Sequence, residues 1–185
     1  MQERLQALAD ADVGLREAAA RSLGELGATE AVPDLCQRLA SGPAVAGATR
    51  RNSPKMQEPC EALLEALGDI GQSNPDVLAL INLYTEHERP IVRCSAFRAL
   101  FQLTGEQHWA QRIIDLLSHP QLPVRRAALL DLGAIGWRTA LEPLSSALVE
   151  NSVKLIALRG LIENGTPGPG DPDDETVLKA MDDLL

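Results

Sequence analysis

Apolar residues recur along the chain at helical spacing, within a phrase that appears five times. In one copy Val124, Ala128 and Leu132 stand four residues apart, which places them on one face of a helix. The copies occupy residues 14–27, 59–71, 91–105, 123–136 and 153–165. Their central leucines are 44, 33, 32 and 29 residues apart, and these are Leu23, Leu67, Leu100, Leu132 and Leu161. The pattern predicts five similar amphipathic helices.

A second apolar segment follows each of the first four copies, at residues 31–39, 76–84, 109–117 and 140–148. Gly27, Gly71 and Gly136 end their copies, where a glycine commonly ends a helix. Paired short helices at this period are typical of an α-solenoid, whose units bury each other's apolar faces. The Val-Arg-x-x-Ala-Ala…Leu-Gly phrase fits HEAT-like repeats better than tetratricopeptide or ankyrin repeats. We predict an all-α solenoid of about five HEAT-like repeats, with a non-repeating bundle as the alternative.

Both ends of the chain depart from the repeat. Residues 1–8 resemble the second half of a preceding unit, and a solenoid normally starts with a polar capping repeat, so an upstream portion is expected to be missing. The segment GTPGPGDPDD at 165–174 is rich in turn residues and cannot be helical. The predicted organisation is a solenoid over 1–164, a linker over 165–175, and a short helix or frayed tail over 176–185.

Composition supports a helical, cytoplasmic protein. Leucine and alanine supply 55 of the 185 residues and aromatic residues only 3%, which argues against a β-sandwich or barrel. No apolar run approaches the roughly 18–20 residues of a membrane span, and the N-terminus lacks the layout of a signal peptide. Three widely separated cysteines without a CxxC pattern fit a reducing compartment.

Charge is distributed unevenly along the chain. The net charge of −9 argues against a nucleic-acid binder. Residues 164–185 hold six acidic residues and one lysine, whereas residues 89–138 hold seven arginines and three acidic residues. The basic stretch predicts a cationic surface for a small anion or an acidic partner, or else solvated arginines on separate faces.

Two sets of cations are candidates for anion binding. The long segment 41–56 between the first two copies contains Arg50 and Arg51, and is either a functional loop or a tolerated insertion. A cation also stands seven residues before four of the central leucines, at Arg16, Arg93, Arg125 and Lys154. A cation at the start of a helix opposes the helix dipole, so each needs a compensating partner. This ladder is either structural or the lining of a binding surface.

Asp131 occupies a position that holds only small residues in the other copies. A carboxylate there must be paired, with Arg98 or Arg125 as candidates, or must face a groove that solvates it. The three histidines show no metal-ligand spacing, and no nucleotide-binding or nucleophile motif is present. We therefore expect neither a metal nor a cofactor.

The chain resembles the E-type (alpha) subunit of the E/F-type phycobilin lyases. The likeness is carried by VRCSAFRALFQLTGEQHWAQRIIDLLSHPQLPVRRAALLDLGAIG at 92–136 and ENSVKLIALRGLIEN at 150–164, and extends over about residues 10–164. LTGE at 103–106 makes it more specific than a general HEAT match. Members of this family carry further helical repeats before the point where this chain begins, so the resemblance implies that N-terminal repeats are lacking.

The resemblance implies attachment of a linear tetrapyrrole, such as phycocyanobilin, to a cysteine of a phycobiliprotein subunit. The bilin is the substrate, and the partners are an F-type subunit, which completes a heterodimer, and the acceptor. Arginine suits the two propionates because its planar fork matches a carboxylate, and an acid beside the pyrroles stabilises the bilin cation. The hypothesis assigns Asp131 to the pyrroles, Tyr84 to ring stacking or core packing, and to the propionates Arg50, Arg51, Arg93 and Arg125.

Two other functions remain open. The first is a non-catalytic interaction scaffold, a common use of HEAT-like solenoids, which the acidic tail and the missing catalytic motif also fit. The second is a relative that carries or detaches bilins without ligating them.

Overall fold

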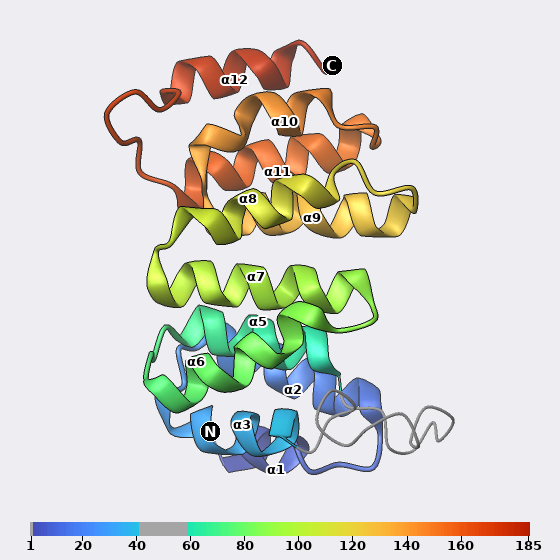
Figure 1. Cartoon of the computed structure of the whole chain (residues 1–185), viewed down its shortest axis with the longest axis vertical. Helices are drawn as coiled ribbons and strands as arrows, with labels where there is room; N and C mark the ends of the chain where they lie inside the picture. The colour runs from blue at the N-terminus through green and yellow to red at the C-terminus, as the bar shows by residue number, and fades with distance from the viewer. Residues whose placement is uncertain (1, 41–58) are drawn as a thin grey trace. The chain divides into compact units, whose positions relative to one another are not determined.

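The computed structural model describes residues 2–40 and 59–185, and within these ranges it is helical without β-strands (Figure 1). The five predicted amphipathic helices are all present, as α2 (Val13–Glu25), α5 (Cys60–Ile70), α7 (Pro90–Thr104), α9 (Leu122–Ile135) and α11 (Asn151–Asn164). Shorter helices alternate with them: α1 (Gln2–Ala7), α3 (Val32–Ala40), α6 (Pro75–Asn82), α8 (Gln107–Leu116), α10 (Leu141–Ser146) and α12 (Asp174–Asp182). In the part of the chain that the structure describes, three 3₁₀ turns adjoin the short helices: η1 (Thr29–Ala31), η4 (Leu83–Glu86) and η5 (Arg138–Ala140). The helical pairing predicted from the repeats is thus confirmed.

Local sequence explains where the helices begin. The side chains of Asp12, Asn74 and Asp173 accept backbone N–H groups in the first turns of α2, α6 and α12. Hydrogen bonds from Thr176 lower the pKa of Asp173 below its usual value, as expected for a capping carboxylate. Pro75 opens α6, where the missing N–H would have no helical partner.

Glycines end three of the long helices. Gly71, Gly105 and Gly136 follow α5, α7 and α9 with φ angles of 72°, 70° and 64°. This left-handed conformation places a strain on residues with a Cβ, so glycine is favoured at the end of a helix. The stops predicted at Gly71 and Gly136 are confirmed.

The helices form two compact units, 1–105 and 106–185. In the first unit α5 packs between α2 and α7, while α3 contacts α5 and α6 contacts α7. In the second unit α9 packs against α11, α8 packs on α9, and both α10 and α12 contact α11. The boundary between the units follows α7, within the stretch 1–164 that the sequence assigns to one solenoid.

The central leucines of the five copies are the core of the repeat. Each is at most 3% exposed, and they are Leu23, Leu67, Leu100, Leu132 and Leu161. Burial of one leucine side chain stabilises the folded chain by about 1.5–3 kcal/mol. The alignment on these residues therefore identified the buried face of each long helix.

Small residues allow the long helices to approach closely. A Cβ added to Gly24 on α2 would lie 2.9 Å from the Cα of Ala66 on α5. In the second unit, a Cβ on Gly133 of α9 would lie 2.6 Å from the carbonyl oxygen of Ala157 on α11. Any side chain beyond a hydrogen at these two glycines would push the backbones apart.

Arg138, 2% exposed, holds the C-terminal segment against the second unit. It donates from Nη2 to the carbonyl oxygen of Gly165 at 2.9 Å and from Nη1 to that of Pro172 at 3.2 Å, and it pairs with the Asp174 carboxylate at 2.6 Å. On α12 itself, Val177 is fully buried. Of the two predicted alternatives, the chain end is therefore a docked helix, which begins two residues earlier than predicted.

Candidate functional site

The ladder of cations has a common structural role in three repeats. Nη1 of Arg16 donates to the carbonyl oxygen of Asp10 at 2.9 Å, and Nη1 of Arg93 donates to that of His87 at 2.8 Å. Arg125 makes the same contact with the carbonyl oxygen of His119, at 2.8 Å. Each guanidinium thus turns back to the end of the preceding short helix or turn, where carbonyl oxygens have no helical partner.

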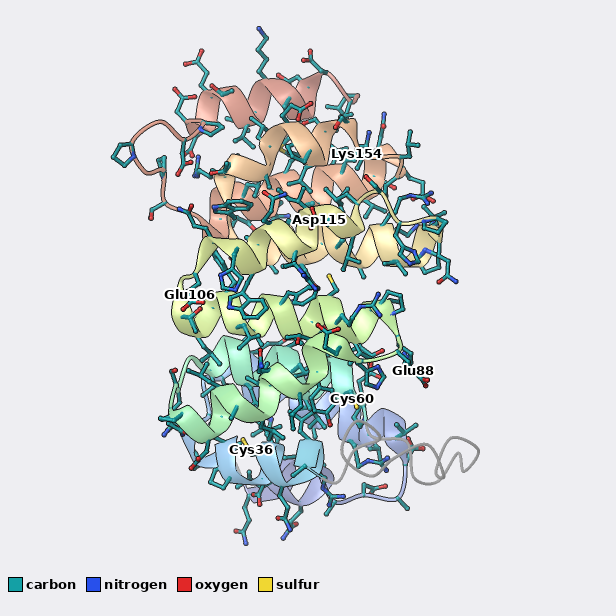
Figure 2. All side chains as sticks on the ribbon, viewed as in Figure 1. Cys36, Cys60, Glu88, Glu106, Asp115 and Lys154 are labelled. Atoms are coloured by element: carbon teal, nitrogen blue, oxygen red, sulfur yellow. The ribbon has the colours of Figure 1, made fainter. Side chains whose placement is uncertain are left out.

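Lys154 plays the same part in the last repeat, although its side chain differs. Its ammonium lies in the first turn of α11 and donates to the carbonyl oxygen of Ser145 near the end of α10, at 2.8 Å (Figure 2). The unfavourable position of a cation at a helix start is therefore offset by the negative end of the helix before it. The carbonyl group of Ser145 is the compensating partner that the sequence requires for Lys154.

The turn before each arginine contains a second repeated contact. Nδ1 of His87 accepts the backbone N–H of Arg89 at 3.1 Å, and Nδ1 of His119 accepts that of Gln121 at 3.1 Å. At the equivalent position Asp10 accepts the N–H of Asp12 at 2.8 Å through its carboxylate. Sequence reasoning missed these acceptors, although their recurrence six residues before each arginine was a signal that could have found them.

His87 is held in its neutral form by its surroundings. Burial, and next the positive charge of Arg89, lower the pKa of its imidazole below the usual value. The ring also stacks on Tyr84, with centroids 6.0 Å apart and planes inclined by 10°. A neutral ring keeps the Nδ1 lone pair available for the turn.

Arg93 and Arg125 retain some capacity to bind an anion. Both are half-buried, and among the residues that the structure describes no hydrogen bond reaches the Nη2 of either. The Nε of Arg125 donates to the carbonyl oxygen of Leu148 at 3.0 Å. Each side chain can therefore offer one nitrogen to a carboxylate, rather than the two-nitrogen fork assumed from the sequence.

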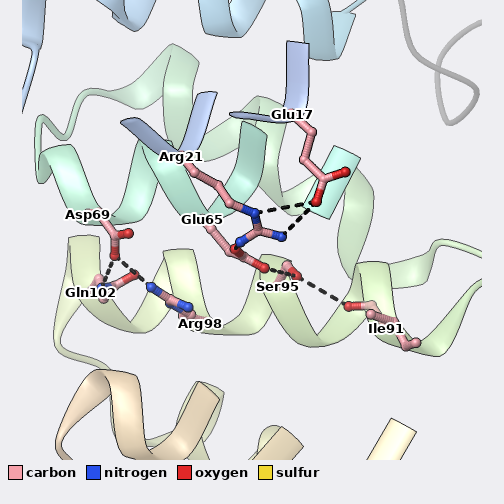
Figure 3. A network of polar contacts seen from close by, with 8 residues as sticks. All are labelled: Glu17, Arg21, Glu65, Asp69, Ile91, Ser95, Arg98 and Gln102. Carbon is pink, nitrogen blue, oxygen red and sulfur yellow. Dashed lines mark hydrogen bonds and ion pairs between the residues drawn. The ribbon is translucent and has the colours of Figure 1, made fainter. Parts of the chain in front are cut away.

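A charged network covers the long helices of the first unit (Figure 3). Arg21 on α2 pairs with Glu17 at 3.2 Å and reaches across to Glu65 on α5. The other oxygen of Glu65 accepts the hydroxyl of Ser95 on α7 at 3.3 Å. One carboxylate thereby links α5 to both of its neighbours.

The same face of α5 carries two further paired carboxylates. Asp69 accepts from Arg98 and from the amide of Gln102, both on α7 and both at 2.8 Å. One turn before Glu65, Glu61 pairs with Arg89. Glu61, Glu65 and Asp69 stand four residues apart on α5, and each is matched by an arginine.

The cationic surface predicted from residues 89–138 is therefore largely neutralised. Four of its seven arginines pair with carboxylates, namely Arg89, Arg98, Arg126 and Arg138. Arg98 and Arg138 are largely buried, whereas Arg89 and Arg126 remain 58% and 43% exposed, as the reading of solvated arginines expects. All four pairs join residues of different elements.

Two of the predicted site residues are buried. Asp131 on α9 is 6% exposed, as its alignment with small residues implies. Arg125, one of the two partners suggested for it, directs its hydrogen bonds to backbone carbonyls. Tyr84 is 0% exposed and donates its hydroxyl to the carbonyl oxygen of Leu39, so of its two suggested roles the position fits core packing and leaves no ring face for a ligand.

Two of the arginines predicted to bind the propionates, Arg50 and Arg51, lie outside the described residues. In residues 2–40 and 59–185, no group of three or more His, Cys, Asp or Glu side chains could hold a metal ion. The helices in these ranges also include none that is long and apolar enough to cross a membrane.

Comparison with known proteins identifies the repeat type. Residues 77–162 match the family of HEAT repeats, and residues 15–41 match the HEAT-like repeat of the PBS lyases. Together with the helix pairs described above, these matches confirm the all-α HEAT-repeat solenoid predicted from the sequence.

Individual relatives are more specific. The chain is 40% identical over 188 residues to phycocyanobilin lyase subunit alpha of Picosynechococcus sp., which covers 100% of this chain and 69% of that protein. It is 53% identical over 133 residues to the bilin biosynthesis protein RpcE of Synechococcus sp., over 72% of this chain and 48% of that protein. The chain thus spans about half of one relative and about two thirds of the other.

A solved structure supports the same relationship. The complex of CpcE and CpcF of phycocyanin lyase from Nostoc sp. contains a chain that matches all of this one with a TM-score of 0.85 at 39% identity. This chain covers 67% of that one. Sequence and fold therefore agree along the whole length compared, and the chain belongs to the family of phycocyanobilin lyase alpha subunits.

Proposed function

We propose that the chain is one subunit of a bilin lyase, which attaches a phycobilin through a thioether to a cysteine of a phycobiliprotein subunit. The observation that carries this proposal is 40% identity to a phycocyanobilin lyase alpha subunit along the entire chain. An F-type subunit is the expected partner, because the matching structure is a complex of CpcE with CpcF. The absence of a CxxC pattern is consistent with a cytoplasmic location.

The reaction asks for positioning and proton control rather than for a reactive side chain of the enzyme. The acceptor's thiol adds across the ethylidene double bond of ring A. A carbon–sulfur bond forms, the thiol gives up its proton, and the tetrapyrrole takes up one proton. No oxidant or reductant is consumed, and the lyase lowers the barrier by holding the bilin in reach of the thiolate and by favouring its protonated form.

We assign the propionates to arginine side chains that retain a nitrogen for them. Arg93 and Arg125 each use Nη1 for backbone carbonyls, and Nη2 is the atom proposed to meet a propionate. Arg50 and Arg51 are proposed for the same purpose from the sequence alone. Tyr84 is not included, because its ring is buried and its hydroxyl is engaged.

Asp131 is proposed to act on the protonation of the bilin. Asp131 is 6% exposed, and an ionised carboxylate attracts a cation more strongly at such a site than in water. The protonated tetrapyrrole is the more electrophilic form, so this interaction would promote attack by the acceptor. Replacement by asparagine retains the shape of the side chain and removes the charge.

An interaction scaffold is the competing function, because six of the seven arginines of the basic stretch pair with carboxylates or backbone carbonyls. Titration of phycocyanobilin with the purified chain together with its F-type partner distinguishes a bilin lyase subunit from an interaction scaffold. A bilin-handling protein shifts and sharpens the visible absorption of the pigment, whereas a scaffold leaves the spectrum of free bilin. An unchanged spectrum at saturating protein would overturn the proposed function.

A further inference from the structure

A groove of about 510 Å³ lies between α3 and α6 in the first unit. Its apolar lining consists of Val32, Pro33, Cys36 and Ala40 on α3 together with Val77 and Leu80 on α6, and Cys36 is labelled in Figure 2. The volume lies within the range of sites that hold a ligand or the side chains of a partner. Among the described residues proposed above for the bilin, none lines this groove.

The groove follows from a difference between the two helix layers of this unit. In one layer α2 and α5 are in extensive contact and approach closely at Gly24 and Ala66. In the other layer α3 and α6 contact each other much less extensively. Because the close contact fixes the spacing of the helices, the groove is a built feature of the fold.

The charges at the groove select its ligand. Glu30 and Asp76 line it at exposed positions, and its described lining residues include no lysine, arginine or histidine. A ligand with carboxylates, such as the propionates of a bilin, is therefore disfavoured there. Cationic groups beside an apolar stripe complement the groove.

We propose that the groove between α3 and α6 is a docking site for an amphipathic helix of a partner protein, with apolar residues against Cys36, Val77 and Leu80 and lysine or arginine facing Glu30 and Asp76. The flanking helices have nine and eight residues and so run for about 12–14 Å, or roughly two helical turns. This length accommodates anchors at positions i, i+3, i+4 and i+7 of the partner. The proposal does not depend on bilin attachment.

Cys36 provides a built-in reporter of occupancy. It is half-buried and lines the groove, whereas Cys60 and Cys94 are 3% and 0% exposed. Burial raises the pKa of the Cys36 thiol, so alkylation at about pH 8.5 is slow enough to follow by mass spectrometry. A ligand in the groove protects this thiol selectively.

The test uses three synthetic helical peptides of equal length. The first has a leucine stripe and lysine at both ends, the second has glutamate in place of each lysine, and the third has the first composition with the stripe scrambled. We expect the first peptide to slow alkylation of Cys36 about tenfold at saturation. The second should bind about fivefold more weakly, as two exposed charge contacts imply.

Variants separate the groove from general adhesion. Glu30→Gln combined with Asp76→Asn should abolish the preference for lysine ends, while the control Glu163→Gln in the second unit should leave it unchanged. Leu80→Asp should abolish protection, with circular dichroism verifying the fold of each variant. Equal protection by the scrambled peptide would overturn the proposal, and so would a Cys36 thiol that reacts as slowly as Cys60 and Cys94 in the free chain.

Discussion

Nη1 of Arg93 donates to the carbonyl oxygen of His87 at 2.8 Å, while the His87 ring accepts the backbone N–H of Arg89, in the turn between them, at 3.1 Å. The same geometry recurs at Arg125 and His119. One residue thus shapes the turn through its side chain and binds the next helix through its carbonyl group. The joints between successive helices are therefore specified by a pair of residues six positions apart.

Replacing Arg93 measures how much this joint contributes to the free energy of unfolding. Arg93→Ala should lower the free energy of unfolding by about 1–3 kcal/mol, because the carbonyl oxygens of His87 and Glu88 lose a charged donor. Arg93→Lys should recover most of the loss, since Lys154 performs this role in the last repeat. Urea unfolding followed by circular dichroism measures both. Equal stability of the alanine variant and the wild type would contradict the assigned role.

His87 predicts a specific dependence of stability on pH. Its pKa is lowered in the folded chain, so the unfolded chain binds the proton more tightly. The contribution of His87 to the free energy of unfolding is complete above its pKa in the unfolded chain, about 6.5. This contribution is lost as the pH falls from that value towards the lower pKa of the folded chain. His87→Asp should flatten this part of the profile between about pH 7 and 5, because Asp10 accepts the equivalent N–H as a carboxylate.

Urea unfolding midpoints of the wild type and of His87→Asp, measured in the same buffers at about pH 7 and 5, check this expectation. The groups that face His87 are Arg89, Glu88 and Glu61, and all of them are retained in the variant. A variant with the same pH dependence as the wild type would show that the ring does not control the joint.

Gly133→Ala tests the close approach of α9 and α11. The new Cβ would lie 2.6 Å from the carbonyl oxygen of Ala157, which is too short for any ordinary contact, so the helices must move apart. We expect a loss of about 1–3 kcal/mol in the free energy of unfolding. Gly168→Ala is the matched control, because its Cβ meets only the Asp171 side chain, at 3.1 Å. A similar effect of both substitutions would indicate a general cost of alanine instead.

Arg138→Ala should release the C-terminal helix. The substitution leaves the carbonyl oxygens of Gly165 and Pro172 without their donor and removes the partner of Asp174, at a cost of about 2–4 kcal/mol. Limited proteolysis should then cut the chain between α11 and α12 much faster. Arg159→Ala is the control, since its exposed pair with Glu163 contributes less than about 1 kcal/mol. An unchanged cleavage rate in the Arg138 variant would contradict the anchoring role.

The sequence was sufficient for the helices but not for the partners of the charged residues. The repeat revealed the buried leucines because burial imposes a helical period that survives divergence between copies. The recurring cations Arg16, Arg93 and Arg125 could be recognised in the same way. Their role could not be predicted, because their guanidinium groups bind backbone carbonyl oxygens, which every residue has.

Other features depended on contacts between distant segments. Arg138 lies 27 and 34 residues from the carbonyl groups that it binds, and nothing local distinguishes it from a solvated arginine. Arg98 in the basic stretch is matched to Asp69 of a helix 29 residues earlier, so the stretch could not be recognised as paired from the sequence.

Covalent transfer of pigment is the most direct measure of the proposed activity. The chain, its F-type partner, phycocyanobilin and an acceptor phycobiliprotein subunit are combined, and the products are separated under denaturing conditions. We predict bilin colour on the acceptor only when this chain is present, and none on an acceptor whose target cysteine is replaced by serine. Acceptor that is equally coloured without the chain, or that stays uncoloured with it, would contradict assignment of this protein as a lyase subunit.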